Sequence, residues 1–453
     1  MQQELWVKSQ SILVGMEFRS GFLVIRNGKI YSIESPNTQP QGEILDFGAR
    51  LVLPGIVDTH AHINEPGRTE WEGFETATLA AAAGGTTTVV DMPLNSIPAT
   101  TTLQALKLKQ EAARNRCRMD YGFWGGIVPE NAGNESELTQ MVRAGVLGFK
   151  CFLIQSGVDE FKMCTRQDLE KAMPILRRLG VPLLVHAELE SLVSPSKHTP
   201  SDYLSYLESR PQTWEVDAIH MMIELCKKTE CRVHIVHLSA GKALPHIERA
   251  KAVGLPFTVE TCPHYLTLTS EAIETGATHF KCAPPIREKS NSEALWKGLK
   301  SSTIDLVVSD HSPCTPELKR LETGDFEKAW GGIAGLQFNF SLMASEARRR
   351  DIEIQDLLQW MSARTAQFAG LTQKGDLTPG KDADFIVYDP SQMTPVTSSR
   401  IHHRHKLTPY LGKEIHGRVD ATFVRGTCVY AHESQMLTVV KNFGENQCNP
   451  SLT

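Results

Sequence analysis

Eight short apolar segments, separated by longer and more polar stretches, constrain the fold of this chain more than any other feature. They lie at residues 51–58, 87–91, 121–127, 145–152, 181–187, 233–238, 257–261 and 305–309. Apolar runs of about this length, bounded by turn residues, are typical of strands that are buried on both faces. Such strands occur mainly in parallel sheets that helices cover.

The stretches between these segments carry helical periodicity. Apolar residues recur at spacings of three and four over 165–179, and 217–228 also has a helical pattern. Eight alternating strands and helices predict a (β/α)8 TIM-like barrel, an α/β fold. A doubly wound open sheet is the alternative, but the chain has neither G-x-G-x-x-G after its first strand nor G-x-x-x-x-G-K-[ST].

The two ends of the chain have a different pattern. Residues 21–25 and 30–33 read as strands on either side of Asn27-Gly28, a dipeptide typical of hairpin turns, and 383–388 and 421–430 also read as strands around turns. We predict that 1–53 and 380–453 form one small β-sandwich domain. Residues 54–379 would then form the barrel.

Charge and cysteine content limit the partners. The 453 residues carry a formal net charge of −5, which argues against nucleic acid or an anionic membrane surface and favours a small-molecule ligand. None of the ten cysteines forms a C-x-x-C pair, so neither a disulfide framework nor a cysteine zinc site is indicated.

Targeting signals are not evident. No apolar run approaches the ~20 residues that span a bilayer, and the first residues do not resemble a signal peptide. Ser451-Leu452-Thr453 differs from the S-K-L peroxisomal address. We expect a soluble cytoplasmic protein, with an organelle as the alternative.

The strongest local motif is His60-Ala61-His62, at the end of the first strand. Residues i and i+2 of a strand point to the same side, so both imidazoles can face one centre. An isolated H-x-H fits two solvated loop histidines equally well. The motif gains weight from the other strand ends.

Four other predicted strands end in ionisable residues. These are Lys150, His186, His237 and Asp310. Barrel active sites form at the carboxyl ends of the strands, so these side chains are expected to converge with the first two histidines. Four histidines and a carboxylate suit zinc or another first-row divalent metal, and two ions would use them all.

Lys150 is unusual because it lies in an apolar strand, where a charged ammonium is costly to bury. A salt bridge to a neighbouring carboxylate is one interpretation. Alternatively, burial favours the neutral amine, which can take up carbon dioxide and become a carbamate. Its two oxygens would suffice to bridge two cations at the ~3.5 to 4 Å spacing of dinuclear hydrolases.

With these motifs the sequence resembles the amidohydrolase superfamily and, within it, the allantoinases, a family of cyclic amidases. The resemblance covers nearly the whole chain. It rests on the motifs at residues 60–68, 71–76, 91–95, 148–152, 262–265, 281–287, 309–314, 330–336 and 380–384.

The resemblance implies a ligand set. His60, His62 and Asp310 would hold one metal ion, His186 and His237 the other, and N6-carboxylated Lys150 would bridge them. The cofactors would be two divalent ions per subunit, zinc or else manganese, cobalt or iron. Because no ligand position is missing, a non-catalytic scaffold is disfavoured. A homotetramer is also implied.

The resemblance further implies hydrolysis of the hydantoin ring amide of (S)-allantoin to allantoate, a step of urate breakdown. A hydroxide shared by the two metals would attack, and Asp310 would carry its proton to the leaving ring nitrogen. Dihydroorotases usually carry Arg where this chain has Asn64, and hydantoinases and dihydropyrimidinases usually carry Tyr where it has Gln155. Both groups remain as alternatives.

Other residues have less certain roles. Asn95 and the backbones of Ala283 and Gly331 are candidate substrate contacts, although each could equally shape a turn. His264 either reaches the substrate or is structural, and His311 is expected to support Asp310. The cluster His402, His403 and His405 is expected to lie on a solvated surface of the β domain.

Overall fold

The computed structural model describes residues 4–191, 199–432, 438–440 and 443–448. The C-terminal Ser451-Leu452-Thr453 therefore lies outside the described residues. Within the described part of the chain, no helix is both long and apolar enough to cross a lipid bilayer.

Eight parallel strands form the central sheet, in chain order from β6 to β13. The sheet closes where Ala61 bridges His311 and the N–H of His62 donates to the carbonyl of His311 at 2.7 Å. The predicted barrel is confirmed, and the open-sheet alternative is wrong. The strands are β6 (Ile56–Ala61), β7 (Thr86–Asp91), β8 (Asp120–Gly126), β9 (Val146–Phe152), β10 (Leu183–His186), β11 (Val233–Ile235), β12 (Phe257–Thr261) and β13 (Leu306–Val307).

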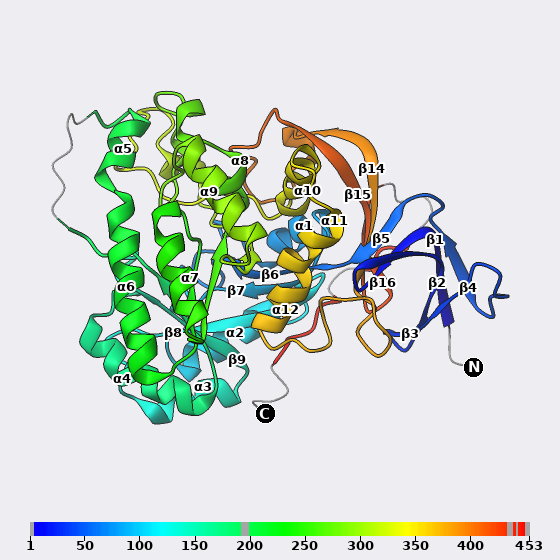
Figure 1. Ribbon diagram of the computed structural model, residues 1–453, viewed down its shortest axis with the longest axis horizontal. Helices are drawn as coiled ribbons and strands as arrows, with labels where there is room; N and C mark the ends of the chain where they lie inside the picture. The colour runs from blue at the N-terminus through cyan, green and yellow to red at the C-terminus, as the bar shows by residue number, and fades with distance from the viewer. Residues whose placement is uncertain (1–3, 192–198, 433–437, 441–442, 449–453) are drawn as a thin grey trace.

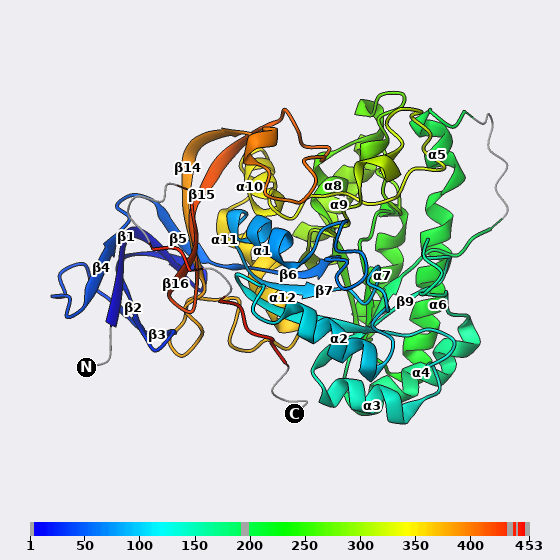
Figure 2. The same cartoon turned by 180° about the vertical axis from the view of Figure 1, so that it is seen from behind.

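Helices surround these strands, as Figures 1 and 2 show. The helix predicted over 165–179 is α4, which begins after a Thr165–Asp168 capping box and ends at Gly180 in the left-handed conformation. The α-helices are α1 (Phe74–Ala83), α2 (Leu103–Ala113), α3 (Glu135–Arg143), α4 (Arg166–Leu179), α5 (Tyr203–Ser209), α6 (Gln212–Thr229), α7 (Leu244–Ala252), α8 (Pro263–Thr267), α9 (Lys289–Lys300), α10 (Asn339–Arg349), α11 (Ile354–Leu358) and α12 (Arg364–Phe368).

Strands from both ends of the chain form a β-rich domain at one end of the molecule (Figure 1). Pairing of β5 with β14 joins the two ends, with Leu53 opposite Ile386. The predicted hairpin is present, and Asn27 and Gly28 both have positive φ. The strands are β1 (Glu4–Val14), β2 (Glu17–Arg26), β3 (Lys29–Glu34), β4 (Glu43–Asp46), β5 (Leu51–Pro54), β14 (Phe385–Pro395), β15 (Glu414–Val424) and β16 (Thr427–Ala431).

One predicted strand is divided in the structure. Residues 51–58 are not continuous, because β5 pairs within the β-rich domain and β6 within the barrel. Gly55 separates them, and a Cβ there would lie 2.2 Å from the Thr87 side chain, so the chain passes too close for any side chain. We propose 53/54 and 379/380 as the domain boundaries.

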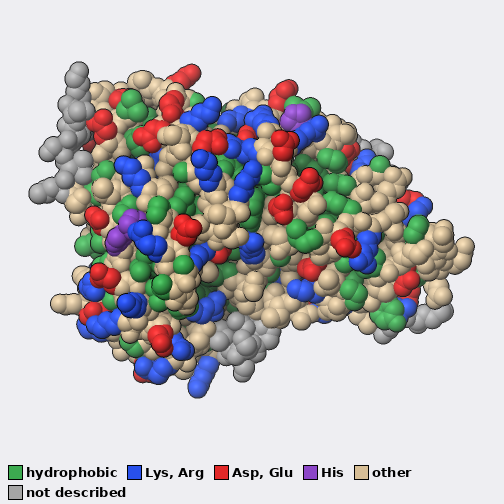
Figure 3. Space-filling view, in the orientation of Figure 1, with side chains coloured by type: hydrophobic (Ala, Val, Ile, Leu, Met, Phe, Trp, Pro, Cys, Tyr) green, Lys and Arg blue, Asp and Glu red, His purple; other side chains and the backbone are tan. Residues whose placement is uncertain are grey.

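A buried ion cluster links the barrel to the β-rich domain. The ammonium of Lys374 lies 2.5 Å from Asp120 at the start of β8, 2.9 Å from Asp382 and 2.7 Å from Asp384, just before β14. Burial alone would lower the pKa of Lys374, but the charges of the three carboxylates raise it above the usual value. On the outer face seen in Figure 3, acidic and basic side chains are mixed.

Candidate metal centre

The ionisable strand ends converge at the carboxyl mouth of the barrel. His60 lies in β6, Lys150 in β9 and His186 at the end of β10, while His237 and Asp310 follow β11 and β13. All five are at most 7% exposed. Ring centroids of His186 and His237 are 4.6 Å apart, and those of His60 and His237 are 5.5 Å apart. The structure therefore brings all the predicted ligand residues together.

One subset has close ligand spacing. Ligand atoms of His60, His62 and Asp310 all lie within 4.8 Å of one another. The Oδ1 atom of Asp310 lies 3.1 Å from Nε2 of His60 and 3.6 Å from Nε2 of His62. Two imidazoles and one carboxylate at this spacing suit a divalent first-row metal ion.

Lys150 has no partner for its buried amine. Its side chain is fully buried, and Nζ makes no hydrogen bond within the described part of the chain. Burial lowers the pKa of Lys150 to about 8, although the charges of Asp310 and Glu260 oppose the shift. The salt-bridge interpretation therefore has no support in this geometry, whereas burial makes the neutral amine more accessible than it is for an exposed lysine.

Glu260 on β12 orients His60, and sequence reasoning missed it. Its Oε1 lies 2.5 Å from Nδ1 of His60, and its Oε2 lies 3.0 Å from Nε2 of His234. Burial opposes its ionisation, but the two imidazoles outweigh burial and lower the pKa of Glu260 to about 2. A carboxylate inside a predicted barrel strand was the available signal.

A second carboxylate supports His186. Glu188 Oε2 lies 2.8 Å from Nε2 of His186 and accepts from Arg210 Nη1 at 2.6 Å. Carboxylates in this position orient ligand imidazoles and raise their basicity.

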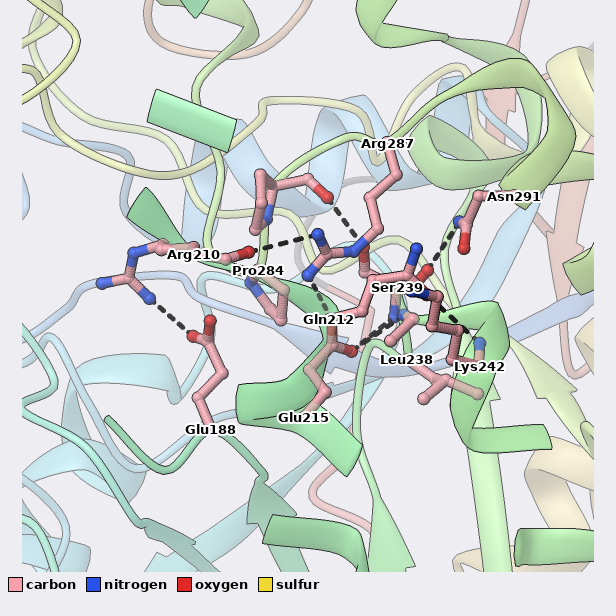
Figure 4. Close-up of polar contacts among 12 residues, drawn as sticks. Glu188, Arg210, Gln212, Glu215, Leu238, Ser239, Lys242, Pro284, Arg287 and Asn291 are labelled. Carbon is pink, nitrogen blue, oxygen red and sulfur yellow. Dashed lines mark hydrogen bonds and ion pairs between the residues drawn. The ribbon is translucent and has the colours of Figure 1, made fainter. Parts of the chain in front are cut away.

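The loop after β11 is held by a neighbouring network (Figure 4). Arg287 donates to Glu215 Oε1 at 2.8 Å and to the carbonyl of Arg210 at 3.1 Å. The other oxygen of Glu215 accepts from the N–H groups of Ser239 and Ala240, two and three residues after His237. This ion pair, also missed from sequence, connects α6 and the segment before α9 to the loop that carries His237.

Three residues of the site have unusual backbone conformations. The φ angles are +40° at His237, +44° at Asp310 and +67° at Asn64. Such conformations are costly for residues with a Cβ, and at this site the surrounding contacts hold them in place.

A cavity of about 300 Å³ opens onto these residues. His62, Lys150, His186, His237 and Asp310 line one side. The candidate substrate contacts line it too, namely Asn95, Ala283 and Gly331, together with Gln155. The cavity thus collects every predicted contact residue beside the ionisable cluster.

Asn64 and Asn95 contact each other. The amide of Asn95 donates to Oδ1 of Asn64 at 3.1 Å, and Asn64 donates to the carbonyl of Pro313 at 3.2 Å. Both ends of the Asn64 amide are therefore used within the protein. The pair places no cationic group here that could hold a substrate carboxylate.

The remaining histidines differ from expectation in part. His264 is buried beside Cys262 and Asp310 but does not line the cavity. His311 is buried, and its backbone closes the barrel. The expectation of a solvated cluster is wrong for His403, which is fully buried 4.7 Å from the His311 ring because its loop packs against the barrel. His402 and His405 are partly exposed.

Comparison with known proteins identifies the family. The model of the amidohydrolase family matches residues 51–429. An allantoinase of Streptomyces avermitilis is 46% identical, over 94% of this chain and 96% of the relative, and one of Arabidopsis thaliana is 42% identical, over 94% and 88%. The structure of an L-hydantoinase (dihydropyrimidinase) from Arthrobacter aurescens superposes with a TM-score of 0.90 at 29% identity, covering 98% of this chain and 99% of the other. The chain therefore belongs to the amidohydrolase family and, within it, to the allantoinases.

Proposed function

We propose that this protein is a cyclic amide hydrolase that opens the hydantoin ring of (S)-allantoin to give allantoate in purine breakdown. The observation that carries the proposal is the convergence of four histidines, Lys150 and Asp310 beside one cavity. The similarity to allantoinases of bacteria, a plant and yeast supports the choice of substrate.

The donor set fits two divalent metal ions. His60, His62 and Asp310 would hold one and His186 and His237 the other, with a carbamate on Lys150 between them. The unpartnered Nζ of Lys150 and Nδ1 of His237, both buried, fit this assignment. Zinc suits these ligands, as would manganese, cobalt or iron. When bound, such ions lower the pKa of water and polarise a carbonyl.

The protein's own groups would move protons and hold the substrate. Burial opposes ionisation of Asp310, but the neighbouring imidazoles hold its pKa well below the usual value, so the carboxyl group is ionised at neutral pH. It would take the proton of the attacking water and deliver it to the leaving ring nitrogen. Asn95 and the N–H groups of Ala283 and Gly331 would hydrogen-bond the ring.

Hydantoinase activity is the second candidate, because the superposed solved structures carry that name. Hydantoinases usually carry a tyrosine at the position of Gln155. The absence of its hydroxyl favours allantoin over hydantoin as the substrate. Dihydroorotase activity is disfavoured by the Asn64–Asn95 pair, which offers no cation to a substrate carboxylate.

One assay separates these activities. The metal-loaded protein is given allantoin, hydantoin, dihydrouracil and dihydroorotate, and kcat/KM is measured for each. We expect allantoin to be preferred. Preference for dihydroorotate would refute the interpretation of Asn64, and absence of both bound metal and ring opening would indicate a non-catalytic scaffold.

Assembly and location are separate proposals. We propose a cytoplasmic homotetramer, by similarity to the family. Light scattering after gel filtration measures the subunit number, and fractionation of the source cells measures the compartment.

A further inference from the structure

Two buried lysines beside the cavity have no carboxylate partner. Lys281 is 9% exposed and Lys319 is 5% exposed, yet within the described residues neither ammonium forms an ion pair. Lys281 donates to the carbonyls of Glu327 at 3.0 Å and Ala329 at 2.7 Å. Buried charges are usually paired, so these two need an explanation.

The contacts of Lys319 favour its charged form, although burial lowers the pKa of the amine. Its Nζ donates to three main-chain carbonyls, those of Lys281 at 3.2 Å, Trp330 at 3.0 Å and Gly332. A neutral amine has only two hydrogens, whereas an ammonium has three. The geometry is therefore that of a cation whose only hydrogen-bond acceptors are peptide carbonyls.

The two lysines join two segments, residues 281–283 and 330–332, that form one wall of the cavity. Lys319 contacts both segments, and the N–H of Gly332 also donates to the carbonyl of Lys281 at 2.9 Å. Gly331 and Ala283 face each other across this joint, since a Cβ on Gly331 would lie 3.7 Å from the Ala283 nitrogen. Both residues line the cavity.

The N–H groups of Ala283 and Gly331 are available to a ligand. Neither donates a hydrogen bond within the described part of the chain. The carbonyl of the Trp330–Gly331 peptide accepts from Lys319, and that of the Cys282–Ala283 peptide accepts from the Tyr206 hydroxyl at 2.8 Å. The ammonium of Lys281 lies 5.1 Å from the centre of the same tyrosine ring.

Hydrogen bonds in series polarise one another. A donor on the carbonyl of a peptide withdraws electron density from its nitrogen and strengthens the N–H as a donor. A cation does this more strongly than a neutral group. Lys319 acts in this way on the N–H of Gly331. Lys281 lies over the Tyr206 ring, where a cation withdraws electron density from the phenol and strengthens its hydroxyl as a donor to the Cys282 carbonyl.

We propose that Lys281 and Lys319 are positioning residues whose ammonium groups hold and polarise the two peptides that bind the carbonyl oxygen of the substrate's cyclic imide that is not attacked. The inference rests on the proposed function and deepens it. The two N–H groups would bind an oxygen that stays in place during ring opening. Loss of such binding raises KM more than it lowers kcat.

The test uses the full-length, metal-loaded protein and its variants Lys319→Met, Lys319→Gln and Tyr206→Phe. Allantoin and hydantoin are both assayed, because they share the ring and differ in the ureido group. We expect Lys319→Met to raise KM about ten- to a hundredfold for both substrates, from the size of hydrogen bonds to charged groups, with kcat and bound metal little changed. Lys319→Gln should have a smaller effect, and Tyr206→Phe should raise KM by about three- to tenfold.

A control and four outcomes complete the test. Lys406 also donates to two main-chain carbonyls, those of Ile401 and His403, but neither of these residues lines the cavity, so Lys406→Met should leave KM unchanged. An unchanged KM in Lys319→Met, or a loss of bound metal that accounts for its defect, would overturn the proposal. Failure of all three test variants to fold would show that these residues act on stability alone. If the unmodified protein opens hydantoin but not allantoin, the proposed function fails while this inference is still tested.

Discussion

Oε1 of Glu260 lies 2.5 Å from Nδ1 of His60, and both side chains are completely buried. The imidazole therefore directs Nε2 toward Asp310 in the site. This contact makes Glu260 part of the support of the proposed metal centre, although Glu260 is not a ligand.

We expect Glu260→Gln to weaken metal binding by about 10- to 100-fold, because the amide removes the negative charge that raises the basicity of His60. Metal retained per subunit after dialysis against graded chelator concentrations measures the effect. Glu17→Gln, a change of an exposed glutamate on β2, is the control. Equal metal retention in both variants would contradict this role.

Lys150→Ala is expected to abolish ring opening and to lower bound metal below two ions per subunit, because no other group can provide the bridging carbamate. Metal analysis and a crystal structure of the unmodified protein provide the measurements. An unmodified lysine pointing away from the metal ions in that structure would refute the carbamate.

Metal uptake by the metal-free protein should depend on pH through Lys150. Only the neutral amine reacts with carbon dioxide, and because the pKa of Lys150 is about 8 the neutral fraction increases as pH rises. At constant dissolved carbon dioxide, the rate at which carbon dioxide activates the metal-free protein should be more than about tenfold higher at about pH 8.5 than at about pH 6.5. Samples without carbon dioxide correct for titration of the histidines. A rate that falls with pH would contradict the assignment.

Asp310→Asn should retain substrate binding and lose turnover. Removal of a general acid–base group lowers kcat by about 10²- to 10⁴-fold, whereas the ring contacts stay in place. Binding is measured by calorimetry and kcat by single-turnover kinetics, with metal content determined in parallel. Turnover within about threefold of the unmodified protein would remove Asp310 from the proton pathway.

Lys374→Met should destabilise the protein by about 3 to 5 kcal/mol, because it removes the cation that three buried carboxylates share. Asp120 keeps its ion pair with Arg425 and Asp382 keeps its pair with Lys29, but within the described residues Asp384 loses its ion-pair partner. Urea unfolding measures the change. Lys8→Met is the control, since its ion pair with Asp46 is largely exposed and should contribute less than about 1 kcal/mol. Equal effects in the two variants would mean that the cluster does not support the domain joint.

Local sequence patterns were sufficient to predict the barrel and to select the residues that the structure brings together at its mouth. Seven of the eight apolar segments overlap one barrel strand each, and the first spans β5 and β6, because parallel strands buried on both faces are mostly apolar. His60, Lys150 and Asp310 stood out for the same reason, since each is an ionisable residue at or near the end of an apolar strand. The resemblance to the amidohydrolase superfamily came from the same motifs.

Contacts between distant segments were decided only by the tertiary structure. Glu260 and Lys319 act on residues that lie 200 and 11 positions away, respectively, and neither has a local pattern that names its partner. Gly55 divides two strands because Thr87 approaches it, and His403 is buried because its loop packs against the barrel. Sequence periodicity reports which face of an element is buried, whereas the partner that covers that face depends on how the whole chain packs.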